Sequence, residues 1–189
     1  NTVLAKLQEE LSEITADYDS LLKEHARLHK KWYNSADFSL NYRGKYHSNE
    51  QLLAEAYSGK QPLELIEKLW KYGRYLFISG TSDKDNPFPL YGLWAGDYRL
   101  MWSHNMANEN TEMIYWHSYV GNLLPFQKGL YKYYNNRIPE YRDNAKKLFG
   151  MNGIYMTAGT TPGVCKPTQV VPVIINWVGA AGWIAEHYC

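Results

Sequence analysis

Residues 48–80, SNEQLLAEAYSGKQPLELIEKLWKYGRYLFISG, decide the fold because they carry the start and stop signals of two adjacent helices. Ser48 is followed three residues later by Gln51, a spacing that forms a capping box at a helix start. Gly59 lies where a short first helix needs a left-handed residue at its end. Pro62 suits the first turn of a second helix, so this stretch predicts a helical hairpin.

Apolar residues spaced three and four apart continue this helical pattern through the rest of the chain. The second helix is expected to turn one such face to a core, formed by Leu63, Ile66, Leu69, Trp70, Tyr75 and Leu76. A further pattern over residues 113–133 is interrupted at Pro125, which predicts a kinked or broken helix. Pro139 and Gly150 bracket a shorter helix, and residues 170–188 are again apolar.

Two segments lack a clean period and are predicted to be loops. They are residues 90–108 and residues 151–166, the second of which contains Gly and Pro. In compact domains a loop as long as the first is more often functional than idle, so we expect it to shape a site. Helices that are joined by loops of very unequal length indicate an all-α fold.

The first part of the chain has a pattern of its own. Between residues 2 and 32, apolar residues alternate three and four apart with charges between them, which predicts one long amphipathic helix. The same stripe suits a coiled coil with His25 at a core position, so an adaptor role stays open. Residues 34–47 suit an exposed connection. We therefore expect a linker helix and connection at residues 1–45 and a helical domain at residues 46–189.

Composition and charge narrow the range of partners. The chain has 189 residues, of which 45% are hydrophobic and 21% are charged, as in ordinary globular domains. A net charge of +1 provides no field to attract nucleic acid or an anionic membrane, and no run of about 20 apolar residues is present. The aromatic content of 15% suits a half-wet cleft such as a sugar-binding site. We expect a neutral ligand, no nucleic acid and no membrane.

The ends of the chain and its cysteines say little about the complete protein. Asn1 is not an initiator Met, and Cys189 ends an apolar stretch without a helix stop signal, so we expect an internal fragment. Cys165 and Cys189 could form one bridge. Two cysteines neither require nor exclude an oxidising compartment.

No pattern in the sequence indicates a metal ion or another cofactor. His25 and His29 lie one helical turn apart, but no third ligand accompanies them. Asp83, Asp85 and Asn86 resemble the start of a calcium loop that lacks its later Gly and Glu. The sequence also lacks a Gly-rich phosphate loop and a nucleophile elbow. We expect neither a metal site nor a cofactor.

The densest group of chemically useful side chains lies in residues 93–116, LWAGDYRLMWSHNMANENTEMIYW, just before a predicted helix. Its members are Trp94, Trp102, His104, Asn108, Asn110, Glu112, Tyr115 and Trp116. One interpretation is that Asn108 or Asn110 only caps the helix, a position that Asn favours. The other is that the two amides hold a water molecule through their side-chain oxygens.

Water held by two amides needs other groups to become a nucleophile. An Asn side chain aims a water molecule but does not take up its proton, so a carboxylate must complete the base. Inverting hydrolysis of a glycosidic bond fits this arrangement. In that reaction an activated water attacks one face of the sugar, while an acid on the other face protonates the leaving group.

The same residues resemble glycoside hydrolase family 95. Residues 108–116, NENTEMIYW, and residues 90–94, LYGLW, match the family's Asn-x-Asn-x-Glu/Gln-Met-Asn-Tyr-Trp signature and the Leu-x-Gly-x-Trp loop before it. Residues 71–82, KYGRYLFISGTS, and residues 179–188, GAAGWIAEHY, are similar to two helices of that family. The resemblance extends in the same order over residues 51–188.

This resemblance implies a partial (α/α)6 toroid of helical hairpins, preceded by a β-rich domain and the linker helix and followed by a smaller β domain. It implies that Asn108 and Asn110 position the attacking water, with support from an Asp of a later hairpin. The family's general acid is a Glu in a Ser-Pro-Glu motif, which this sequence lacks. Glu186 precedes that position and is expected to be an ordinary helical glutamate. The resemblance also implies a secreted or periplasmic protein.

One hypothesis and two alternatives follow. The hypothesis is a fragment of an inverting α-L-fucosidase-like hydrolase whose glycan substrate is bound by Trp94, Trp102, His104, Glu112 and Trp116. Ile114 and Met106 depart from the family pattern, and His104 could supply the missing polar contact. The sugar could therefore be L-galactose, which differs in one hydroxymethyl group. The alternatives are a toroid that binds sugar without cleaving it, and the coiled-coil adaptor.

Overall fold

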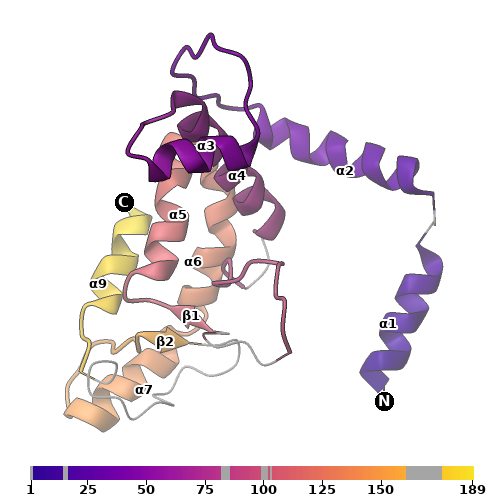
Figure 1. Ribbon diagram of the computed structural model, residues 1–189. Helices are drawn as coiled ribbons and strands as arrows, with labels where there is room; N and C mark the ends of the chain where they lie inside the picture. The colour runs from indigo at the N-terminus through magenta and orange to yellow at the C-terminus, as the bar shows by residue number, and fades with distance from the viewer. Residues whose placement is uncertain (1, 15–16, 82–85, 99–101, 103, 161–175) are drawn as a thin grey trace.

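The computed structural model of the chain describes residues 2–14, 17–81, 86–98, 102, 104–160 and 176–189. In this part the chain is mostly helical, with one sheet of two short strands, so the prediction of an all-α fold is confirmed (Figure 1). None of the described helices is long and apolar enough to cross a membrane. Asp83, Asp85 and Cys165 lie outside the described residues, and so do the predictions that concern them.

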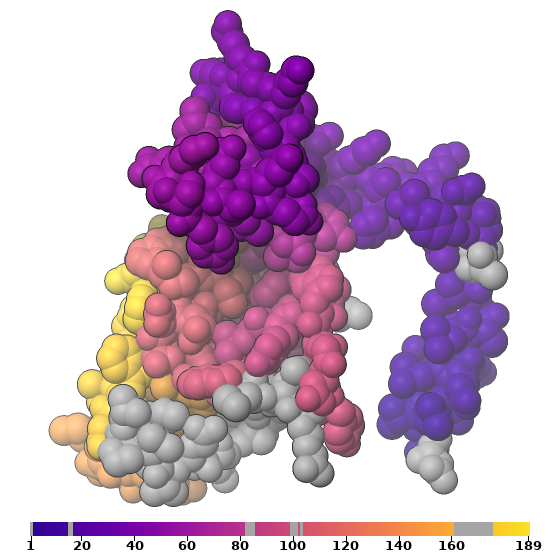
Figure 2. Space-filling view, viewed as in Figure 1, coloured from indigo at the N-terminus to yellow at the C-terminus, as the bar shows by residue number. Residues whose placement is uncertain are grey.

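The predicted N-terminal helix is in fact two helices, because Asp17 caps the start of a second one. They are α1, Thr2–Glu13, and α2, Tyr18–Tyr33. The Asp17 carboxylate caps α2 by accepting hydrogen bonds from the amide of Asp19 (3.2 Å) and from the hydroxyl of Ser20. Figures 1 and 2 show α1 standing apart from the helical body, and neither helix buries a described residue. The coiled-coil alternative stays a prediction.

The predicted hairpin is confirmed. Its first helix, α3, Asn49–Tyr57, begins at a capping box in which Ser48 exchanges hydrogen bonds of 3.3 and 3.0 Å with the residue three positions on. Gly59 follows α3 with φ +87, a conformation that glycine adopts without strain. Pro62 directly precedes the second helix, α4, Leu63–Gly80. Local signals therefore determine where both helices begin.

The chain then forms a second hairpin. Helix α5, Asn110–Val120, is followed by the 3₁₀ turn η1, Leu124–Gln127, and by α6, Lys128–Asn135. The predicted break is present, but it begins near Asn122, which adopts φ +55, and Pro125 lies within η1. Figure 1 shows α6 running back beside α5.

The last helices complete the body. Helix α7, Ile138–Phe149, ends as predicted at Gly150, which adopts φ +66. Helix α9, Ala180–Ala185, and the 3₁₀ turn η2, Glu186–Tyr188, make up most of the described part of the last apolar segment. Glu186 is exposed, as an ordinary helical glutamate is expected to be.

A small sheet that the sequence did not indicate joins the two predicted loops. Strand β1, Asn105–Met106, pairs antiparallel with β2, Gly159–Thr160. Next to this pair, the amide of Ala107 donates to the carbonyl of Ala158 (2.6 Å). Strands of two residues are too short to show an alternating pattern, so this pairing is invisible in the sequence. It holds the loop before α5 against a distant segment.

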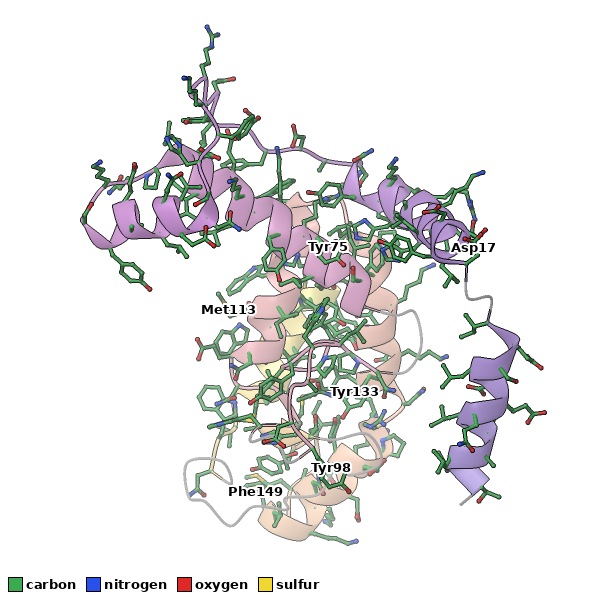
Figure 3. All side chains as sticks on the ribbon, turned by 45° about the vertical axis from the view of Figure 1, so that its right-hand side comes forward. Asp17, Tyr75, Tyr98, Met113, Tyr133 and Phe149 are labelled. Atoms are coloured by element: carbon green, nitrogen blue, oxygen red, sulfur yellow. The ribbon has the colours of Figure 1, made fainter. Side chains whose placement is uncertain are left out.

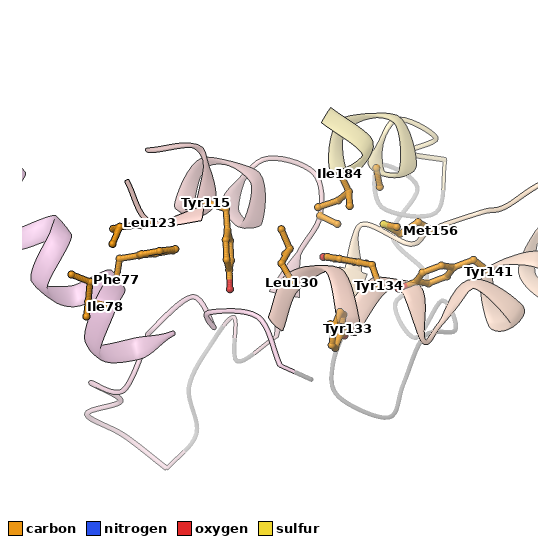
Figure 4. Close-up of a cluster of buried hydrophobic side chains, with 12 residues drawn as sticks. Phe77, Ile78, Tyr115, Leu123, Leu130, Tyr133, Tyr134, Tyr141, Met156 and Ile184 are labelled. Carbon is orange, nitrogen blue, oxygen red and sulfur yellow. The ribbon is translucent and has the colours of Figure 1, made fainter. Parts of the chain in front are cut away.

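An aromatic core fills the space between these elements (Figure 4). Its buried rings are Phe77, Tyr115, Tyr133, Tyr134 and Tyr141. Phe77 of α4 meets Tyr115 of α5 edge to face, with the ring centres 5.2 Å apart. Leu130 of α6 and Ile184 of α9 complete the cluster from the other side. The core therefore fixes α5 between α4, α6 and α9.

The predicted core face of α4 is wrong for most of its members. Four of them are between 37% and 59% exposed, namely Leu63, Ile66, Leu69 and Tyr75. Trp70 and Leu76 are half-buried, and the helix buries Arg74, Phe77 and Ile78 instead. Because α4 carries apolar residues on more than one face, its period alone did not identify the buried face. The packing of α5 and η1 against Phe77 makes that choice.

Arg74 ties three parts of the chain together from a position that is 2% exposed. Its guanidinium donates hydrogen bonds to the carbonyls of Trp32 and Tyr33 at the end of α2, and to that of Gly121 at the end of α5. It also donates to the Ser35 hydroxyl (2.8 Å). The last carbonyls of a helix lack partners within the helix and carry partial negative charge, so a cation stabilises them.

Replacing Arg74 with Met is expected to lower the free energy of unfolding by roughly 3 kcal/mol, because buried carbonyls would lose their donors. Urea unfolding followed by circular dichroism measures this change. Arg27→Met is the control, since Arg27 pairs with Glu24 at 2.7 Å between side chains that are 65% and 59% exposed. The control should lose less than about 1 kcal/mol. Equal losses would contradict the role of Arg74.

Candidate active site

The loop before α5 begins with a tight turn that sets the position of Trp94. The amide of Gly92 donates to the carbonyl of Pro89 (2.8 Å), and the amide of Trp94 donates to that of Tyr91 (3.0 Å). Gly92 adopts φ +56, and a Cβ atom on it would lie 2.8 Å from the rings of Phe88 and Trp94. A side chain at this position would be strained, so glycine is required. Trp94 itself is half-exposed.

Further along the loop, Trp102 and His104 form a ring pair whose centres lie 6.0 Å apart. Trp102 is half-exposed and adopts φ +67, a conformation that bulky residues rarely take. The Nε2 atom of His104 lies 2.9 Å from the Met106 sulfur. Burial lowers the pKa of His104, so its imidazole is mostly neutral at pH 7. The pair offers an aromatic face beside an uncharged polar group.

The two asparagines lie at the start of α5 but do not cap it. The cap position belongs to Glu109, whose side chain makes no capping hydrogen bond. The side-chain oxygen of Asn108 is buried and accepts no hydrogen bond from any described residue. Asn110 is the first residue of the helix and is exposed. The interpretation that either asparagine only caps the helix is therefore wrong.

Glu112 is fully buried in the first turn of α5. Neither of its carboxylate oxygens has a hydrogen-bond partner in the described part of the chain. Burial raises the pKa of Glu112 to about 7, while nearby backbone amides oppose the shift and the charge of Glu109 adds to it. An unpaired carboxylate is costly inside a protein, so this group holds its proton nearly up to neutral pH.

Other polar atoms of the same two segments share this property. Oxygens of Asn105, Thr111 and Thr160 are also buried without a hydrogen-bond partner among the residues described. Asn105 pairs with Thr160 across the β1–β2 sheet. We call Asn105, Asn108, Thr111, Glu112 and Thr160 the polar cluster. Buried polar groups nearly always have partners, so such a cluster is a place where water or a polar ligand is expected to bind.

The structure brings only part of the predicted site together. The ring pair and most of the polar cluster lie within one short stretch of chain that ends in α5. Trp94 and Trp116 are half-exposed, but in the described structure no ring contact joins either of them to the ring pair. Tyr115 is fully buried and links the loop to the helix, because its hydroxyl accepts a hydrogen bond from the amide of Phe88 (2.8 Å).

Sequence reasoning missed three members of the polar cluster. Thr111 lies between two predicted site residues, and Asn105 directly follows His104, so their places in the chain were a signal for both. Thr160 joins the cluster only through the pairing of β1 with β2. No pattern in the sequence indicates that contact.

Other hollows lie away from this site. Two open cavities, of about 430 and 480 Å³, are lined mainly by residues of α2 and α4, and His29 lines both of them. The rings of His25 and His29 stack with their centres 5.6 Å apart. Within the described residues, no group of three or more His, Cys, Asp or Glu side chains is placed to hold a metal ion.

Gly92→Ala is expected to lower the free energy of unfolding by about 1–3 kcal/mol, because the turn would be strained and Trp94 would have to move. Urea unfolding measures the loss, and the indole NMR resonance of Trp94 should shift. The matched control is Gly96→Ala in the same loop, where a Cβ atom meets nothing within 4 Å. The control should change stability by less than about 0.5 kcal/mol. An unchanged Trp94 resonance in Gly92→Ala would contradict this account of the turn.

Comparison with known proteins places the chain in a family. Residues 17–189 match the glycosyl hydrolase family 95 catalytic domain. The chain is 25% identical over 177 residues to alpha-L-fucosidase 2 of Arabidopsis thaliana, which covers 90% of this chain and 21% of that protein. It is 26% identical over 160 residues to the probable alpha-fucosidase A of Aspergillus niger, covering 83% and 20%.

A third relative matches a shorter part of the chain. Over 91 residues the chain is 32% identical to the probable alpha-fucosidase A of Aspergillus oryzae, covering 47% of this chain and 13% of that protein. The chain thus spans about a fifth of the length of the first two relatives. The family match, however, covers nearly all of the chain and includes the whole candidate site. The chain therefore belongs to glycosyl hydrolase family 95.

Proposed function

We propose that this chain is part of an inverting glycoside hydrolase that removes terminal α-L-fucosyl, or α-L-galactosyl, residues from glycans. One observation carries the proposal: the side-chain oxygen of Asn108 is buried, accepts no hydrogen bond from the described residues and does not cap α5. Such an oxygen can accept a hydrogen bond from a water molecule and so hold that water in place. Asn110 stands two residues further on and supplies the second amide.

The asparagines aim the water but do not activate it. An amide is neutral at all ordinary pH values, so the proton of the attacking water must go to a carboxylate. Glu112 is a poor candidate for this base, because none of its surface is exposed and it holds its proton below about pH 7. The family resemblance implies an Asp from a later hairpin as the base, and a Glu in a Ser-Pro-Glu motif as the general acid. Both would lie in other parts of the protein.

The remaining site residues suit a neutral sugar. Trp94, Trp102 and Trp116 are half-exposed, and an indole face can pack against the apolar side of a sugar ring. His104 is mostly neutral at pH 7 and can donate or accept a hydrogen bond to a hydroxyl group. A pocket of this kind separates fucose from L-galactose by only about 1–3 kcal/mol, so both sugars stay within the proposal.

The proposal includes the organisation of the protein. Residues 1–45 would serve as linker helix and connection, and residues 46–189 as the first hairpins of an (α/α)6 toroid. The remaining hairpins and the flanking β domains would belong to other parts of the same protein. The family resemblance also implies that the enzyme is secreted or periplasmic. Two structural observations support this reading, namely the α3–α4 hairpin and the reversal of the chain between α5 and α6.

In an enzyme that contains this chain in full, Asn108→Ala and Asn110→Ala should each lower kcat on an aryl α-L-fucoside by about 100-fold or more. The equilibrium affinity for L-fucose should change only a few fold, because a group that aims the nucleophile acts mainly in the transition state. Stopped assays and calorimetry measure the two quantities. The control is Asn152→Ala, in an exposed loop after α7, which should leave both unchanged.

Two outcomes would contradict the proposal. If both asparagine variants kept kcat within a few fold, neither amide would aim the water. If the unmodified protein bound L-fucose but showed no turnover on any fucoside or L-galactoside, a carbohydrate-binding toroid would be the better description.

A further inference from the structure

Glu112 stands in an unusual place for a carboxyl group. It is the third residue of α5, two positions after Asn110, and none of its surface is exposed. A group that touches a sugar from the wall of a pocket is expected to present some surface, as Trp94 and Trp116 do. Glu112 instead is fully buried within the first turn of the helix. Its two oxygens make no hydrogen bond of good geometry with the described residues, although the backbone amides of Glu109 and of Glu112 itself lie near enough to oppose the rise of its pKa.

The described groups whose charges act on Glu112, or that Glu112 acts on, carry no positive charge. Glu109 and Tyr115 of its own segment are an acid and a buried phenol. Tyr133 and Tyr134 of α6 are buried phenols, and the burial that raises the pKa of Tyr134 keeps its hydroxyl protonated. No ion pair of the described residues reaches Glu112.

The described basic side chains that pack against Tyr115 and Tyr133 have other partners. Arg137 lies 3.8 Å above the Tyr133 ring and donates to the Tyr133 carbonyl (2.8 Å). His187 packs against Tyr115 and Tyr119, and burial lowers its pKa. His104, in the loop before α5, is likewise shifted toward its neutral form by burial. Among the described residues, an ionised Glu112 would therefore have no counter-ion in its ion-pair contacts.

We propose that Glu112 is a positioning residue that works in its protonated form, holding the start of α5 and the two asparagines in place, and that its ionisation disables the site. The inference rests on the proposed role of the asparagine pair. A protonated carboxyl can donate one hydrogen bond and accept others, so it can act as a neutral link between polar groups. An ionised one can only accept, and it would draw water into the base of the helix.

The stability of the chain should report this ionisation. Glu112 has an ordinary pKa of 4.5 when unfolded and a raised one, about 7, when folded. Between these values the folded state keeps a proton that the unfolded state releases, so stability falls as pH rises from 4.5 to 7 and is level above that. Glu112→Gln keeps the shape of the protonated side chain and is neutral at every pH. The variant should therefore not lose stability between pH 4.5 and 7.

The first test uses the 189-residue chain. At pH 8 the melting temperature of Glu112→Gln should exceed that of the wild type by roughly 5–10 °C, and at pH 4 the two should agree within about 1 °C. The carboxyl carbon of Glu112, followed by NMR in ¹³C-labelled protein, should titrate near pH 7. The matched control is Glu140→Gln, because Glu140 is also the third residue of its helix, α7, but is exposed. It should show no such alkaline gain.

The second test uses the enzyme that contains this chain. In the wild type kcat should fall about tenfold per pH unit above pH 7 if Glu112 must be protonated. Glu112→Gln should abolish that fall when its kcat at each pH is compared with its own value at pH 5–6. Glu112→Ala, which leaves the polar cluster without its link, should lower kcat at every pH. A merely structural role would change stability and leave the pH profile in place.

The possible results separate the two proposals. A Glu112 carbon that titrates below pH 5.5, or a Glu112→Gln profile with an unchanged alkaline fall, would overturn the role of Glu112. If Glu112 titrates near 7 but Asn108→Ala leaves kcat intact, the water-positioning function fails on its own. A fall of activity that follows Glu112 in the wild type and disappears in Glu112→Gln supports the inference.

Discussion

The arrangement of the helices depends on the hydrogen bonds that the Arg74 guanidinium donates. It reaches the last carbonyls of α2 and the carbonyl that follows α5, so one cation stabilises the negative ends of two helices at once. No described carboxylate pairs with it, and the backbone is its counter-charge. Because α2 buries none of its residues, its attachment to the body relies on this group and on ring contacts such as Trp32 with Phe126 (5.2 Å).

Fixing the end of α5 also fixes its start, where the candidate site lies. The side of the helix is held by the aromatic core around Tyr115, and its first turn is held by the β1–β2 pair through the preceding loop. The candidate site therefore has three supports that come from distant parts of the chain. Met113, on the same helix, lies outside this packing and is half-exposed (Figure 3). Catalytic geometry needs such rigid support, because small displacements of a positioning group reduce rates strongly.

The electrostatics of the site favour uncharged groups throughout. His104 is mostly neutral at pH 7, Asn108 is an amide, and Glu112 keeps its proton nearly to neutrality because burial opposes its charge. The chain as a whole has a net charge of only +1. Neutral polar atoms that are buried and make no hydrogen bond to the described residues can form hydrogen bonds with water or with sugar hydroxyls, and they do not attract an ion. This property, and the half-exposed indoles, support a neutral glycan as the substrate of the proposed enzyme.

The sequence by itself determined where several helices begin and end and which segment is the candidate site, because caps, turns and the segment 108–116 depend on residues that are close together in the chain. Thus the capping box at Ser48 and the left-handed Gly150 were predictable. Only the tertiary structure decided which face of α4 is buried, that Thr160 joins Asn105, and that the Glu112 side chain is fully buried. These features arise from contacts between segments far apart in the chain, and the free energy of burying a side chain depends on those contacts and not on local spacing.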